Sequence, residues 1–174
     1  MDFPYPIHWP SFFTATIQHW KPLLSDNRYK DIIVSSLQFL VKEKRIGLNA
    51  FVIMSNHLHL IWQPFPPFEP IEIQSSFMKF TAHQMKRLLE KEDPEKLELY
   101  RSDKRDRQYQ FWKRESLSIE LFNPAVFEQK LDYIHDNPVR AKLCLNAEDY
   151  QYSMAKYYHT GGKQDDFGML SHYL

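Results

Sequence analysis

The sequence has one cysteine, Cys144, and only four glycines among 174 residues. A single cysteine excludes an internal disulfide, and it also excludes zinc or iron-sulfur sites built from several thiolates. Scarce glycine, together with a 16% share of aromatic residues, excludes a low-complexity or disordered chain. Because 43% of the residues are hydrophobic, we expect residues 1–174 to fold as a single domain with a substantial core.

The sequence also lacks an excess of either charge and any long apolar run. Lys and Arg number 22, as do Asp and Glu, so no global positive field attracts nucleic acid. A balanced total charge does not exclude a local basic stripe, and Lys and Arg cluster within residues 100–114. No stretch approaches the roughly 20 apolar residues of a membrane span, and the N-terminus has no signal-peptide pattern. We therefore expect a cytoplasmic protein with no membrane association.

The first part of the chain predicts a strand followed by a helix. Residues 11–18 mix aromatic and β-branched side chains, which is typical of a strand. Apolar residues then recur at helical spacing over about 27–45. Asp26 or Asn27 can cap the start of this helix, and Gly47 is expected near its end.

A β-hairpin and a second helix are predicted next. Two apolar runs, 48–54 and 57–62, are separated only by Ser55-Asn56, which indicates a tight turn. After a proline-rich stretch, apolar residues at helical spacing predict a helix over about 71–91.

A fourth strand and a third long helix are predicted in the rest of the chain. Residues 109–113 (YQFWK) are predicted to form the fourth strand, and Asn123-Pro124 is a strong helix start. The order β-α-β-β-α-β is that of an α+β, ferredoxin-like fold, with helices on one face of an antiparallel sheet and C-terminal helices added. We expect the charged loop at about 91–107 to be mobile and the tail at about 159–174 to be flexible.

Two histidines open the second hairpin strand. His57 and His59 are two residues apart, so on a strand both imidazoles leave the same face while Leu58 enters the opposite layer. Two neighbouring neutral imidazoles can begin a divalent metal site. On its own, however, this spacing more often belongs to a pair of ordinary polar residues.

A second candidate pair lies on the helix that follows Asn123. Tyr133 and Asn137 are four residues apart and share a face beside the apolar seam. The alternative is that Tyr133 only packs and that Asn137 only ends the helix before Pro138. The apolar seam consists of Phe127, Leu131 and Ile134.

Three segments together resemble one protein family. They are FVIMSNHLHLIWQ at 51–63, FW at 111–112 and LDYIHDNPVRAKL at 131–143. In this order they resemble the single-tyrosine HUH transposases, most of all the REP-associated tyrosine transposases of bacteria. The resemblance extends over about residues 5–158, and it implies cleavage and rejoining of single-stranded or hairpin DNA through a covalent 5′-phosphotyrosine.

The resemblance assigns roles to four residues. His57 and His59 match the paired histidines of the HUH motif and would bind the metal, with Asn137 at the place of the helix amide that completes the site. Tyr133 matches the nucleophile. The implied cofactor is Mg²⁺ or Mn²⁺, although two imidazoles would also suit Zn²⁺.

DNA contacts are expected from residues that flank these motifs. The aromatic pair divides: Phe111 is expected in the core, whereas Trp112 could stack on bases. The sequence does not decide between a monomer and a homodimer. Two alternatives also remain, namely a metal-dependent nuclease that uses water and a catalytically silent nucleic-acid-binding module. The candidate phosphate contacts are Lys113, Arg114, Arg140 and Lys142.

Overall fold

A four-stranded antiparallel sheet forms the centre of the computed structural model, which describes residues 6–170. Its strand order is β2-β3-β1-β4, and α1 and α2 follow β1 and β3 in sequence. This connectivity is the ferredoxin-like arrangement, so the predicted fold class is confirmed. The strands are β1 (Ser11–Thr16), β2 (Ile46–Ile53), β3 (His57–Pro64) and β4 (Leu117–Glu120).

The predicted hairpin between β2 and β3 is present and sets the register of the histidines. A tight turn closes it, in which the backbone N–H of Met54 donates to the carbonyl of His57 at 2.8 Å. On the other side of β3, Thr14 lies opposite His59 and Thr16 lies opposite His57. Since side chains alternate along a strand, these four side chains share one face of the sheet.

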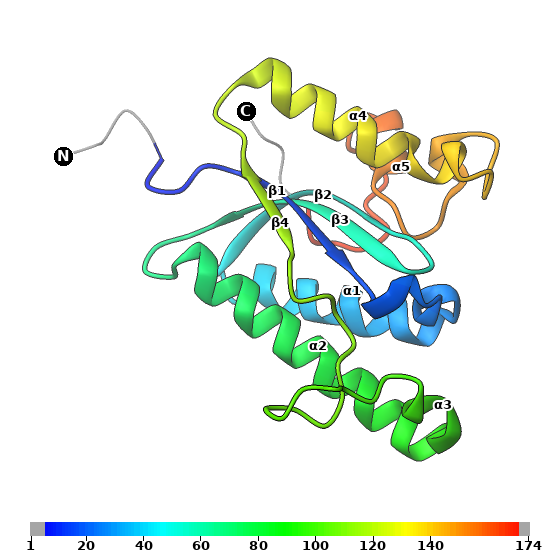
Figure 1. The fold of residues 1–174 in the computed structure, drawn as a ribbon. Helices are drawn as coiled ribbons and strands as arrows, with labels where there is room; N and C mark the ends of the chain where they lie inside the picture. The colour runs from blue at the N-terminus through cyan, green and yellow to red at the C-terminus, as the bar shows by residue number, and fades with distance from the viewer. Residues whose placement is uncertain (1–5, 171–174) are drawn as a thin grey trace.

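Helices α1 (Asn27–Lys42) and α2 (Pro70–Glu92) cover the opposite face (Figure 1). Asp26 caps α1 as predicted, because its carboxylate accepts from the backbone N–H of Arg28 at 3.0 Å. The predicted end of this helix is wrong. It stops at Lys42, Lys44 adopts a left-handed φ of 53°, and Gly47 already lies inside β2.

The core between the sheet and α2 is aromatic. The rings of Phe13 and Trp62 stack at 5.0 Å, and Phe77 meets the Trp62 ring edge-on at 5.4 Å. Phe80, which also follows the apolar spacing, is 50% exposed because it lies on the outer side of α2.

The C-terminal helices α4 (Pro124–Arg140) and α5 (Ala155–His159) lie on the other side of the sheet (Figure 1). The predicted start of α4 is confirmed, since the side chain of Asn123 accepts from the backbone N–H of Ala125 at 2.8 Å. The smaller elements are α3 (Pro94–Glu98) and the 3-10 turns η1 (Gln18–Trp20), η2 (Leu23–Ser25) and η3 (Ala147–Asp149).

The predicted fourth strand at 109–113 is wrong. That segment makes two isolated bridges, between Trp112 and Ile17 and between Tyr109 and Arg101, and β4 follows it at Leu117–Glu120. The apolar side chains of Phe111 and Trp112 are buried and gave the segment its strand-like pattern. The true strand is exposed along its whole length at the edge of the sheet, so it has no apolar run to reveal it.

The two segments expected to move are partly built into the fold. Helix α3 lies within 91–107, where the side chains of Leu97 and Tyr100 are buried. In the tail, Met169 is buried and Phe167 meets the ring of Phe51 edge-on at 5.0 Å. The last part of the tail, 171–174, lies outside the described residues. None of the helices within 6–170 combines the length and the apolar character that a membrane span needs.

Candidate active site

Helix α4 brings its tyrosine onto the histidine face of the sheet. The Tyr133 ring lies edge-on to the His59 ring at 5.2 Å and to the Phe12 ring at 6.0 Å. The rings of His57 and His59 are 5.0 Å apart. The predicted apolar seam holds the helix in this place, since Phe127, Leu131 and Ile134 are all buried.

One ring nitrogen of His59 has a hydrogen-bond partner, and the other has none among the described residues. Its Nδ1 lies 2.7 Å from the hydroxyl of Thr14, whereas its buried Nε2 has no hydrogen-bond partner among residues 6–170. Burial lowers the pKa of His59 to about 3, and the neighbouring His57 and Lys130 act in the same direction. The ring is therefore neutral at ordinary pH, and a tautomer that donates Nδ1–H to Thr14 presents the Nε2 lone pair to the site.

His57 contacts the side chains of two asparagines, Asn56 and Asn137. Its Nδ1 lies 2.7 Å from the Asn56 side-chain oxygen, which can only accept, so Nδ1 carries the proton. Burial lowers the pKa of His57, and a hydrogen bond with the side chain of Asn137 partly offsets this effect. Pro138 does not disturb this contact, since α4 continues through it to Arg140.

Two cations lie beside the tyrosine. The Arg140 guanidinium is 4.9 Å from the centre of the Tyr133 ring, and the Lys130 ammonium is 5.9 Å from it. Arg140 was a predicted phosphate contact, whereas Lys130 was missed, although its place three residues before Tyr133 puts it on the same helix face. Thr14 was also missed, because its role depends on a strand register that sequence spacing alone does not give.

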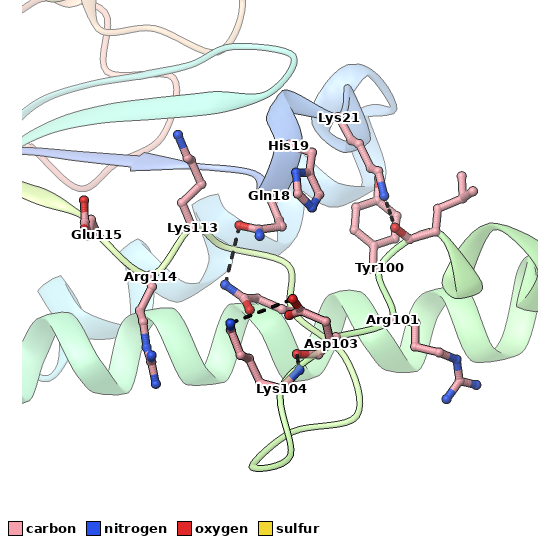
Figure 2. Close-up of a pocket in the computed structure, with 13 residues that line it drawn as sticks. Gln18, His19, Lys21, Tyr100, Arg101, Asp103, Lys104, Lys113, Arg114 and Glu115 are labelled. Carbon is pink, nitrogen blue, oxygen red and sulfur yellow. Dashed lines mark hydrogen bonds and ion pairs between the residues drawn. The ribbon is translucent and has the colours of Figure 1, made fainter.

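The other predicted DNA contacts lie in different surroundings. Lys113 and Arg114 line a cavity of about 570 Å³ and leave the chain in opposite directions (Figure 2). Lys142 is exposed just beyond α4. The expectation that Trp112 stacks on bases needs correction, because the side chain is only 6% exposed and its indole N–H donates to Thr81 at 3.0 Å. Phe111 is buried as predicted.

The donor set fits a divalent metal through nitrogen and amide ligands. Within residues 6–170 there is no cluster of three His, Cys, Asp or Glu side chains. The Nε2 of His59 nevertheless has no hydrogen-bond partner among the described residues, the His59 ring contacts both His57 and Tyr133, and His57 in turn contacts the amide of Asn137. Thr14 and Asn56 hold the outer nitrogens of the two rings, which is how metal-binding imidazoles are oriented in proteins.

Two solved structures with a similar fold are described as transposases. No family model matches the chain, and no curated protein matches it. A REP-associated tyrosine transposase bound to a REP hairpin is 18% identical, with a TM-score of 0.63 over 100% of this chain and 98% of that one. The chain has the fold of that tyrosine transposase. A structure described as a proposed transposase from Deinococcus radiodurans R1 is 14% identical, with a TM-score of 0.52 over 78% of this chain and 95% of that one.

His135, next to Tyr133 but one step around the helix, is a structural residue. Its ring packs against Tyr158 with centroids 5.0 Å apart, and its Nε2 is buried without a partner among the described residues. Burial lowers the pKa of His135 to about 4, although Asp132 and Asp136 act in the opposite direction.

Mild acid is therefore expected to destabilise the fold through His135. His135 takes up a proton near pH 6.5 in the unfolded chain but only near pH 4 in the folded protein. The free energy of unfolding therefore decreases as the pH falls from 6.5 to 4. The loss is at most about 3 kcal/mol. Urea unfolding across the window should show a smaller loss for His135→Phe than for wild type or for His83→Gln, an exposed histidine on α2. Equal losses in all three proteins would contradict this role for His135.

Proposed function

We propose that this protein cuts and rejoins single-stranded or hairpin DNA, with Tyr133 as the nucleophile. The observation that carries the proposal is the convergence of Tyr133, His57 and His59 on one face of the sheet, from segments some seventy residues apart. The fold supports it, because the transposase solved with a REP hairpin has the same arrangement of elements over its length.

Tyrosine suits a reaction that must be reversible. Attack by the Tyr133 hydroxyl oxygen forms a bond to phosphorus and breaks the bond between phosphorus and the 3′ oxygen, so the strand leaves with a 3′-OH. The phenol gives up its proton and the departing oxygen gains one, which balances the step. Because a phenol is a better leaving group than a sugar alkoxide, a free 3′-OH can reverse the reaction and join a new strand.

The neighbouring side chains supply positive charge and orientation. Phosphoryl transfer depends mostly on neutralising the phosphate oxygens and aligning the nucleophile. Lys130 and Arg140, which both lie beside the Tyr133 ring, can pair with those oxygens, and the stacked rings of Phe12 and His59 limit where the tyrosine can point. His57, His59 and Asn137 would hold Mg²⁺ or Mn²⁺, which acts as a Lewis acid on a phosphate oxygen when bound.

A trapping assay tests this function. The purified protein is incubated with labelled hairpin oligonucleotides that carry single-stranded flanks, the REP hairpin among them, in Mg²⁺ or Mn²⁺. A covalent protein–DNA adduct that survives denaturing electrophoresis, and that disappears when a strand with a free 3′-OH is added, is the expected result. Cleaved DNA without any adduct would instead indicate a nuclease that uses water. Binding without cleavage, unchanged by a chelator, would indicate a silent binding module.

A further inference from the structure

The tryptophan at the end of η1, Trp20, is unusually exposed for its size. Its side chain is 62% exposed, whereas Trp62 and Trp112 are buried. Both Trp20, at φ 51°, and His19, at φ 57°, lie in the left-handed region that bulky L residues rarely adopt. The backbone therefore turns outward at a conformational cost and leaves a large aromatic ring in solvent.

Trp20 is fixed next to the histidine strand. Its backbone N–H donates to the carbonyl of Ile17 at 2.9 Å, and its own carbonyl accepts from the side chain of Asn56 at 3.2 Å. The same Asn56 side chain also receives the Nδ1–H of His57. The side-chain amide of Asn56 therefore contacts both the backbone of Trp20 and the ring of His57 in the candidate metal site.

A lysine without a carboxylate partner contacts the Trp20 ring. The ammonium of Lys113 lies 3.5 Å from the centre of the indole. Among the described residues no carboxylate pairs with Lys113, whereas Lys104 and Arg114 in the same cavity lie within 4 Å of aspartates. The cavity that Lys113 lines, together with His19 and Lys21 on either side of Trp20 in sequence, carries five Lys or Arg side chains against two carboxylates, so its charge suits a phosphate backbone (Figure 2).

We propose that Trp20 and Lys113 form a subsite for one nucleotide of single-stranded DNA, adjacent to the cleavage site. A base stacks on the free surface of the indole, and the ammonium of Lys113 contacts the phosphate attached to that nucleotide. This combination is how proteins hold single strands without reading their sequence. The proposal rests on the proposed function, because it takes the strand being cut as its ligand.

Binding of a fluorescein-labelled poly(dT) strand, followed by anisotropy, tests the subsite. Trp20→Ala is expected to weaken binding by about five- to a hundredfold, the range typical of one lost base stack, while Trp20→Phe keeps most of the affinity. Lys113→Gln should reduce the slope of log affinity against log salt by about 0.7, the value for one phosphate contact to a single strand. Poly(dT) should also quench the tryptophan fluorescence of wild type more than that of Trp20→Phe.

Two matched controls and the trapping assay separate the possible failures. Phe80→Ala removes an exposed aromatic ring from α2, and Lys42→Gln removes a charge from the end of α1; neither should change binding. Affinity for poly(dT) within twofold of wild type in Trp20→Ala, or no binding of poly(dT) by wild type, would overturn the subsite. If wild type still forms the hairpin adduct in either case, the proposed function stands and only the subsite fails.

Discussion

Tyr133→Phe is expected to abolish the covalent adduct, with a loss of at least about a thousandfold in strand cleavage. The substitution removes a single oxygen and leaves the ring, so the contacts with His59, Phe12 and Arg140 remain. No hydrogen bond of the Tyr133 hydroxyl exists within residues 6–170, and the stability of the fold should therefore not change. Denaturing electrophoresis of the labelled adduct measures the effect, and thermal unfolding verifies the fold.

The matched control is Tyr157→Phe, which makes the same change at a half-buried tyrosine on α5. This variant should form the adduct at the wild-type level. DNA affinity of Tyr133→Phe should also stay near that of wild type, since the cations around the ring are untouched. An adduct that persists in Tyr133→Phe would show that another residue attacks the phosphate.

Most of the fold follows from local sequence patterns. Aromatic and β-branched residues located β1, and two apolar runs with a tight turn between them located β2 and β3. Helical spacing located α1, α2 and α4, and the cap residues Asp26 and Asn123 start their helices as predicted. The end of α1 was placed too late, because a lysine, Lys44, takes the left-handed conformation for which glycine is the usual residue. The strand at the sheet edge was missed, since a short exposed strand needs no apolar run.

The candidate site was predictable in its motifs but not in its supporting contacts. His57, His59, Tyr133 and Asn137 were singled out from the sequence, and the structure brings all four together. The contact of Thr14 with His59 depends on the pairing of β1 with β3, which joins residues 45 positions apart. Such pairing is fixed by the whole sheet and not by local spacing.

The tryptophans show where composition is misleading. Trp112 lies next to basic residues in the sequence, which suggested that it stacks on DNA bases. In the structure its side chain is buried and its indole N–H donates a hydrogen bond to Thr81. Sequence alone does not indicate that Trp20 is exposed, because a large aromatic residue is usually buried. Its exposure results from two consecutive left-handed residues, a feature that no propensity of His19 or Trp20 predicts.

Loss of metal binding in His57→Ala is the second large effect that we expect. His57 is half-buried at the start of β3, so truncation should cost little stability, whereas the metal would lose one of three donors. Mn²⁺ affinity, measured from the electron paramagnetic resonance of the free ion, should fall by more than about a hundredfold. That is more than the roughly 10- to 100-fold expected for Thr14→Val, which removes only the group that orients His59.

The same titrations determine whether Asn137 is a ligand or only a partner of His57. If its amide binds the ion, Asn137→Ala should weaken Mn²⁺ binding as strongly as His57→Ala does, and Asn137→Asp should restore or strengthen it, because carboxylates suit Mn²⁺. His83→Ala, at an exposed position on α2, controls for nonspecific binding to imidazole. Mn²⁺ affinity that is unchanged in His57→Ala would rule out the histidine pair as a metal site, whatever the result with Asn137.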